Sequence, residues 1–165
     1  MNIPRITRHL LGTQRLVNRA FPPQNLLAIE QAIKSSEAAH TGEIRFVVEG
    51  ALDGTPLYAG QSARERAVDV FSQLRIWDTE HNNGVLIYLL LVDRDVEIVA
   101  DRGIHARVDQ QEWETICRAM EASFKQGDFG GGVVNGIRAV TRHLAKHFPA
   151  AGANPNELPN KPVIL

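Results

Sequence analysis

The fold is decided by the stretch NGVLIYLLLVDRDVEIVADRGIH, residues 83–105. Residues 85–92 are almost entirely apolar, which is typical of a strand that is covered on both faces. Asp93 and Arg94 then predict a tight turn, and the alternation over 96–100 predicts a strand that returns antiparallel to the first. The sequence therefore predicts a hairpin at the centre of a sheet that is buried beneath helices.

The segments on either side of this hairpin predict helices both before and between the strands. Apolar residues recur at helical spacing in 2–19, 23–40, 62–74, 109–124 and 133–144, and they alternate with polar residues in a strand near 44–48. The expected order is helix, helix, strand, helix, strand, strand, helix, helix. This order favours an α/β fold in which a small mixed sheet carries helices on both faces.

Composition and charge exclude several classes of protein. The chain has 165 residues, of which 44% are hydrophobic and 22% are charged, as expected for one globular domain. The formal net charge of -1 supplies no overall field that would attract nucleic acid, so no nucleic acid partner is expected. Cys117 is the only cysteine, the start does not resemble a secretory signal, and no apolar run approaches the roughly 20 residues that span a bilayer. We expect a cytoplasmic protein.

The ends of the chain differ in composition from its middle, which divides the sequence into three parts. Residues 1–20 are predicted to be a basic helical segment, 21–149 the folded domain, and 150–165 an irregular tail with three prolines. The first segment contains no acid, and its four arginines are expected to meet a partner protein or an anionic membrane surface, peripheral to the membrane. If this segment projects, its deletion is expected to leave a folded domain; the alternative, that the helix covers the core, stays open. The four residues are Arg5, Arg8, Arg15 and Arg19.

The polar residues that follow the second strand of the hairpin are expected to face the loop that precedes the first. If the turn has two residues, Leu91 lies opposite Val96, and Asn82 lies near His105. Ligands in open α/β sheets favour the crevice outside the carboxyl ends of strands, and Asp101 follows such an end. The predicted crevice consists of His81, Asn82, Asn83, Asp101, Arg102 and His105.

Four motifs in this order resemble the TPM domain family, named after a thylakoid lumen protein, a photosystem II repair protein and a worm receptor modulator. They are TGEI at 41–44, NGVL at 83–86, a returning strand that ends near a glycine, and GDF at 127–129. The similarity covers about residues 21–148. It implies a three-layer α/β/α sandwich. It also implies one of three roles: an acid phosphatase, a binder of calcium or magnesium, or an accessory factor for membrane complexes.

The sequence departs from the family pattern in the predicted crevice. Before the central strand, familiar members have Asp-Asn-Gly, where this chain has Asn82-Asn83-Gly84. After the returning strand they tend to have Gly-Tyr-Gly-Leu-Glu, where this chain has Asp101–His105. Calcium prefers several carboxylate and carbonyl oxygens, so an arginine and an imidazole make a poorer cation site and a better anion site. A weak divalent cation is the only cofactor that the resemblance implies. Candidate metal ligands are Asp78, Asp101 and Asp128.

Simpler interpretations stay open for each of these residues. Asp101 can end a strand by accepting backbone N–H bonds, His105 can be a hydrogen-bonded imidazole, and Asp128 can cap a helix. Cys117 lies on the apolar stripe of its helix, where a core position is favoured over a nucleophile. No catalytic residue is therefore assigned, and Asp101, Arg102 and His105 are only candidates.

Two functions are compatible with the sequence. The preferred one is a non-catalytic interaction or accessory module for a membrane-associated partner, which would use the basic N-terminal segment. The alternative is a weak metal-assisted acid phosphatase centred on Asn83, Asp101, Arg102 and His105. In that enzyme Arg102 would hold the phosphate, Asp101 would hold a metal or water, and His105 would be the general acid. The altered acidic features of the crevice place the enzyme second.

Overall fold

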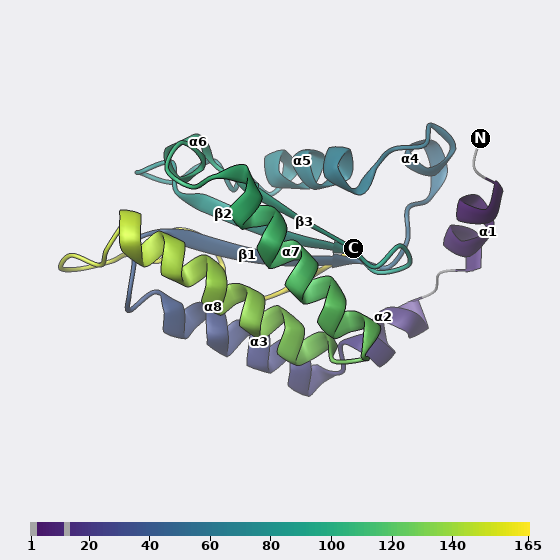
Figure 1. Ribbon diagram of the computed structural model, residues 1–165, viewed down its shortest axis with the longest axis horizontal. Coiled ribbons are helices and arrows are strands. Elements are labelled where there is room, and N and C mark those ends of the chain that lie inside the picture. Colours follow the sequence, from purple (N-terminus) through teal and green to yellow (C-terminus); the bar gives the residue numbers. More distant parts are fainter. Residues whose placement is uncertain (1–2, 12–13) are drawn as a thin grey trace.

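The computed structural model describes residues 3–11 and 14–165, and it has the expected α/β architecture (Figure 1). A four-stranded sheet with the order β3-β2-β1-β4 carries helices on both faces. The elements are α1 (Ile3–Leu11), α2 (Gln14–Ala20), α3 (Pro23–Ser36), β1 (Glu43–Glu49), α4 (Gly54–Tyr58), α5 (Ala63–Gln73), β2 (Gly84–Leu90), β3 (Asp95–Ala100), α6 (Arg102–His105), α7 (Gln110–Lys125), α8 (Phe129–His147) and β4 (Val163–Ile164).

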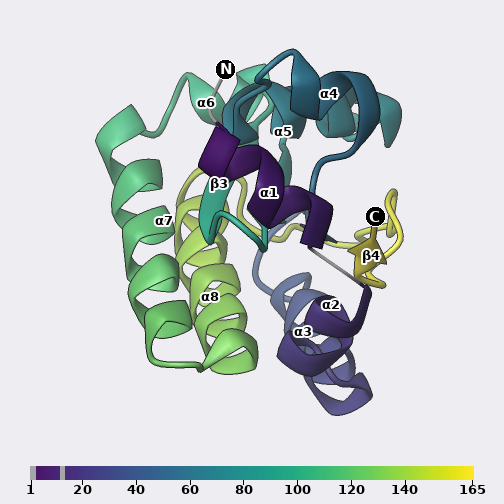
Figure 2. The ribbon, with the colours of Figure 1, turned by 90° about the vertical axis from the view of Figure 1, so that its right-hand side faces the viewer.

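The sheet is mixed, as the sequence predicts. Strand β2 runs parallel to β1 and antiparallel to β3, and β4 runs parallel to β1. Every residue of β1 and β2 is buried, which explains why residues 85–90 carry no polar alternation. Helices α3, α7 and α8 cover one face, and α5 covers the other (Figures 1 and 2). The three-layer α/β/α sandwich is thereby confirmed.

The predicted register of the hairpin is wrong by two residues. Leu89, not Leu91, lies opposite Val96. The connection is longer than two residues because Leu91 and Val92 continue along β1 instead, where their N–H groups donate to Glu49 and Gly50 at 2.9 and 3.1 Å. The loop can then close only because Arg94 adopts a left-handed conformation, with φ of 53°.

The N-terminal segment folds onto the domain, so the expectation of a projecting arm is wrong. In place of one helix over 2–19, the described residues form α1 and α2. Val17 is 1% exposed and His9 is 2% exposed. The imidazole of His9 lies between two partners, since its Nδ1 accepts the Leu52 N–H at 2.8 Å and its Nε2 lies 3.1 Å from Asp93 Oδ2. The arginines of this segment are therefore displayed on a fixed surface.

The C-terminal tail is irregular over most of its length, but it ends in the sheet. Val163 and Ile164 form β4 and pair with Val47 and Val48, which corrects the expectation of a wholly irregular 150–165. Upstream, the carboxylate of Glu43 accepts the N–H groups of residues 157 and 158 at 3.0 and 3.3 Å. A buried acid at the start of β1 thus holds the tail against the domain.

This buried acid predicts a pH-dependent stability. Burial raises the pKa of Glu43 from 4.5 to about 7, although the two backbone hydrogen bonds lower it. Because the pKa of Glu43 is higher in the folded state, its protonation stabilises the fold. This contribution is complete below pH 4.5 and is lost as the pH rises through 7. We expect the loss to be about 3 kcal/mol.

Substitution Glu43→Gln should remove this contribution. The free energy of unfolding is measured with urea at pH 5 and at pH 8 for the parent and for the variant. Other groups titrate equally in the two proteins, so the difference between the two pH-dependent changes isolates Glu43. The parent should lose more stability than the variant over this interval. Equal changes in the two proteins would contradict the assignment.

Candidate functional site

The residues of the predicted crevice lie where β3 ends and β2 begins, but most of them serve local structure. Asp101 caps α6, since its Oδ1 accepts the N–H of Arg102 at 2.7 Å. Arg102 Nε donates to Asn82 Oδ1 at 3.1 Å, and the N–H of Gly103 donates to the Asn82 carbonyl at 2.9 Å. The structure therefore brings Asn82 and Arg102 together and uses Asp101 as a helix cap.

The remaining crevice residues do not converge on this pair. Asn83 is fully buried, and its Nδ2 donates to Thr41 Oγ1 at 3.4 Å. His81 and His105 are exposed, and within the described residues neither forms a side-chain hydrogen bond or ion pair. One oxygen of Asp101, Oδ2, is buried without a partner in the described part of the chain. The group as a whole lacks the mutual contacts of a catalytic constellation.

The three candidate metal ligands are engaged on separate elements. Asp78 forms an exposed ion pair with Arg75 at 2.8 Å, and Asp128 caps α8 by accepting the Gly131 N–H at 2.9 Å. Asp101 caps α6. Across residues 3–11 and 14–165, no group of three or more His, Cys, Asp and Glu side chains is placed to hold a metal ion.

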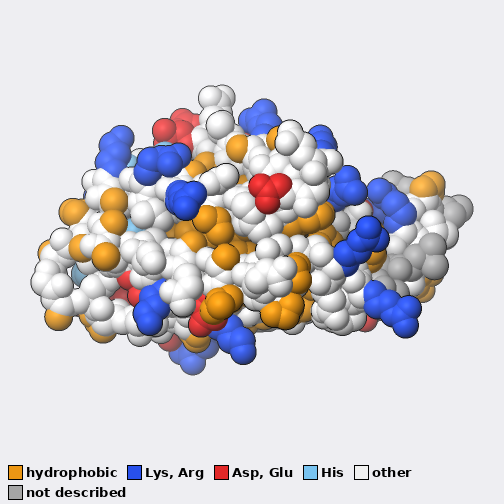
Figure 3. Space-filling model, turned by 90° about the horizontal axis from the view of Figure 1, so that it is seen from below, with side chains coloured by type: hydrophobic (Ala, Val, Ile, Leu, Met, Phe, Trp, Pro, Cys, Tyr) orange, Lys and Arg blue, Asp and Glu red, His pale blue; other side chains and the backbone are white. Residues whose placement is uncertain are grey.

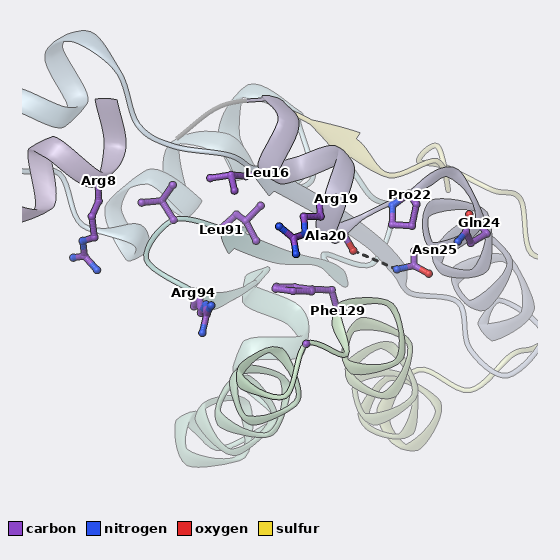
Figure 4. Close-up of a pocket in the computed structure, with 12 residues that line it drawn as sticks. Arg8, Leu16, Arg19, Ala20, Pro22, Gln24, Asn25, Leu91, Arg94 and Phe129 are labelled. Atoms are coloured by element: carbon purple, nitrogen blue, oxygen red, sulfur yellow. Dashed lines mark hydrogen bonds between the residues drawn. The ribbon is translucent and has the colours of Figure 1, made fainter. Parts of the chain in front are cut away.

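A different site lies at the opposite end of the sheet, beyond the carboxyl ends of the parallel strands β1 and β2. It is a pocket of about 820 Å³ between α2, the loop that follows β2, and the start of α8 (Figure 4). Crevices at this edge of open α/β sheets are preferred ligand sites. The lining residues are Arg8, Leu16, Arg19, Ala20, Pro22, Gln24, Asn25, Leu91, Val92, Arg94, Gly127 and Phe129.

The floor of the pocket is apolar and held by aromatic packing. The ring of Phe129, at the start of α8, stacks on Phe124 with centroids 5.2 Å apart and meets Phe21 edge-on at 5.8 Å. Leu91 comes from the β2 loop and Leu16 from α2, and Leu16 is 43% exposed. These contacts fix the position of Phe129 before any ligand arrives, which favours binding because little side-chain entropy is lost.

The rim of the pocket is cationic. In Figure 4 the side chain of Arg19 extends between Leu91 and the ring of Phe129, and Arg94 approaches the pocket from the loop. Within the described residues, neither arginine forms an ion pair with an acid. Figure 3 shows several Lys and Arg side chains at the end of the molecule where α1 and α2 lie.

Asp93, which adjoins the lining residues Val92 and Arg94, is already neutralised. Asp93 accepts Arg5 Nε at 2.9 Å and lies 3.7 Å from Arg8 Nη2. Burial acts to raise the pKa of Asp93, but hydrogen bonds from Arg5 and His9 outweigh it, and the pKa falls below its ordinary value. The carboxylate stays ionised and bound to α1. Arginine pairs bidentately with carboxylate and phosphate, so the pocket suits an anion with an apolar portion.

Sequence reasoning found part of this site and missed its centre. Arg8 and Arg19 were expected to be surface cations, and both line the pocket, whereas Arg5 is occupied by Asp93 and Arg15 is exposed outside the lining. Arg94 was read only as a turn residue. Two features of the sequence point to this pocket: the GDF motif and the carboxyl ends of the apolar strands. They are far apart in the chain, and only the fold brings them together.

The comparisons with known proteins agree with this architecture. A family model described as TPM domain matches residues 18–143. The chain belongs to the TPM domain family. The NMR structure of the BA42 protein from the psychrophilic bacterium Bizionia argentinensis is similar to this TPM domain, with a TM-score of 0.74. The two are 35% identical, and the match covers 86% of this chain and 93% of that chain.

Two further findings bear on the setting of the TPM domain. No curated protein matches the chain. None of the helices within the described ranges is both long enough and apolar enough to cross a membrane. The matched region begins inside α2, so α1 precedes it, and the ion pair of Arg5 joins α1 to Asp93 within the matched region.

Proposed function

We propose that this TPM domain is a non-catalytic interaction module of the cytoplasm that binds an acidic, partly apolar segment of a membrane-associated partner protein. The observation that carries the proposal is the combination, in one pocket, of an apolar floor with Arg19 and Arg94, which form no ion pair with an acid in the described part of the chain. Carboxylates of the partner would meet Arg19 and Arg94, and an apolar side chain would rest on Phe129. The pocket is concave, so it suits an inserted side chain better than the flat surface of a bilayer.

Charge reversal at the rim tests this proposal. We expect the full chain to bind a fluorescent peptide with phenylalanine flanked by glutamates, and to bind it more weakly as salt is added. The double substitution Arg19→Glu and Arg94→Glu should weaken binding at least about tenfold, or about 1.4 kcal/mol, in fluorescence anisotropy.

The matched control reverses two exposed arginines on α8, Arg138→Glu and Arg142→Glu, and so changes the net charge equally. It should leave the affinity within about twofold of the parent. Vesicles of phosphatidylcholine and phosphatidylserine provide a second arm. Binding of vesicles, but not peptide, with the same dependence on Arg19 and Arg94 would make the ligand a membrane surface. Equal effects of the two double variants would exclude the pocket.

The weak metal-assisted phosphatase ranks second. Its candidate residues are occupied elsewhere: Asp101 caps α6, Arg102 bonds to Asn82, and Asn83 is fully buried. A general acid must come within hydrogen-bond reach of the leaving group beside the phosphate-binding arginine. Hydrolysis of a phosphate ester that is lost on Asp101→Asn and on His105→Gln would favour the enzyme over the interaction module.

A further inference from the structure

Strand β3 forms one edge of the sheet, and part of its backbone points outward. The N–H of Asp101 donates to Gly84 at 2.9 Å, so odd-numbered residues of β3 bond to β2. The N–H and carbonyl groups of Val96 and Ile98 therefore face away from the sheet. Backbone groups that point outward in such a row are a template for another strand once the contacts that cover them are displaced.

Side chains from two helices occupy these backbone groups. The N–H of Val96 donates to Glu121 Oε1 of α7 at 3.2 Å, and the carbonyl of Ile98 accepts Arg64 Nη1 of α5 at 2.5 Å. The side chain of Arg64 is 42% exposed, so it can swing into solvent without unpacking the core. The edge is thus closed by contacts that another chain could replace.

The groove along this edge is predominantly acidic. It has a volume of about 190 Å³ and lies between α5 and α7. Its two arginines are paired, Arg64 with Glu97 at 3.4 Å and Arg118 with Glu114 at 3.2 Å. The acids left without an ion pair in the described part of the chain are Asp95 and Glu121.

The pKa of Asp95 is consistent with an excess of negative charge in this groove. The pKa of Asp95 is raised to about 6, first by burial and then by the neighbouring carboxylates of Glu97, Glu121 and Asp93, against a lowering by Arg5. A cation from outside would relieve this repulsion. The strand of a second copy of the chain would instead bring its own Asp95 and Glu97 to the same acids, so self-association is disfavoured.

We propose that the edge of β3 accepts an extended, basic segment of a partner protein, which adds to the sheet as a further strand. Its backbone would replace Arg64 and Glu121 at Ile98 and Val96, and its lysines or arginines would pair with Asp95 and Glu121. Strand addition of this kind takes affinity from main-chain hydrogen bonds and specificity from side chains. This surface is separate from the arginine-rimmed pocket, so either proposal can hold without the other.

A cationic β-forming peptide tests the proposal on the full chain. The probe is fluorescent Lys-Val-Lys-Ile-Lys-Val-Lys, and its counterpart has glutamate in place of each lysine. Arg64→Gln should strengthen binding of the cationic probe several-fold, because it removes the competing donor at Ile98 and frees Glu97. Val96→Pro should weaken binding at least about tenfold, because it removes an outward N–H without removing a bond to β2.

Hydrogen exchange supplies a readout that does not depend on the folding of the proline variant. In the parent, bound probe should slow exchange of the amide of Ile98, and it should leave amides around the arginine-rimmed pocket unchanged. Slowed exchange at Ile98 together with the Arg64→Gln effect would support strand addition. Equal binding of the glutamate peptide, protection elsewhere, or unchanged binding by a folded Val96→Pro variant would overturn it.

Discussion

A chain lacking residues 1–19 should unfold on the order of 10–20 °C below the parent, because α1 and α2 are part of the packed domain. The deletion removes Val17, which is 1% exposed, and burial of such a side chain contributes about 1.5–3 kcal/mol. It also removes Arg5 and His9 from Asp93, leaving a half-buried carboxylate without those partners. Together these losses are expected to reach on the order of 5 kcal/mol.

Differential scanning calorimetry of the truncated and full chains measures this effect. Arg15→Ala is the matched control, since Arg15 is exposed on α2 and its loss removes charge without removing packing. Its stability should stay within about 0.5 kcal/mol of the parent. If the truncated chain melts within a few degrees of the parent, the contacts of α1 and α2 contribute little.

Gly84→Ala should be the most damaging single substitution of a glycine, because the first residue of β2 has no room for a side chain. A Cβ at this position would lie 2.1 Å from the carbonyl oxygen of Ile76 and 2.9 Å from its Cγ2. Ile76 is fully buried, and the carbonyl of Gly84 also accepts the N–H of Asp101, so neither backbone can move freely. We expect a loss of at least about 3 kcal/mol, or failure to fold.

Gly50→Ala provides the comparison. Gly50 lies at the end of a strand rather than at its start, and among the described residues a Cβ there would meet only Val17 Cγ2 at 3.0 Å, the end of a side chain. A shift of a few tenths of an ångström relieves that contact, so the variant should lose about 1 kcal/mol or less. Urea unfolding of both variants gives the two free energies. Similar losses would show that the backbone contact of Gly84 relaxes as easily as the side-chain contact of Gly50.

The fold could be predicted because its strongest signals are local. The apolar run over 85–92 fixes a buried strand, and the alternation at 96–100 fixes its antiparallel neighbour. The register could not be predicted, because Leu91 and Val92 bond to the backbone of β1 and Gly50, a partner that no turn rule identifies. Tertiary hydrogen bonding overrode the local preference for a short turn.

The candidate site was harder to predict for the same reason. Asp101, Arg102 and His105 are a conspicuous cluster in the sequence, yet local capping and a bond to Asn82 account for the first two. The arginine-rimmed pocket combines α2, the loop after β2 and the start of α8, which are far apart in the chain. Whether α2 folds back or projects depends on burial of Val17, and a single apolar residue is too weak a signal to decide it.

The attachment of the C-terminal tail to β1 has a consequence for the order of folding. The bond between Arg45 and Lys161 joins residues 116 apart in the sequence, whereas β2 and β3 are joined by a short loop. Closing so long a loop costs entropy before the contact is gained, so the hairpin should form early and the β1–β4 pairing late. During synthesis, the outer edge of β1 emerges long before its partner. Charged side chains at Glu43, Arg45 and Glu49 along that strand would then help to keep nascent chains from pairing with one another.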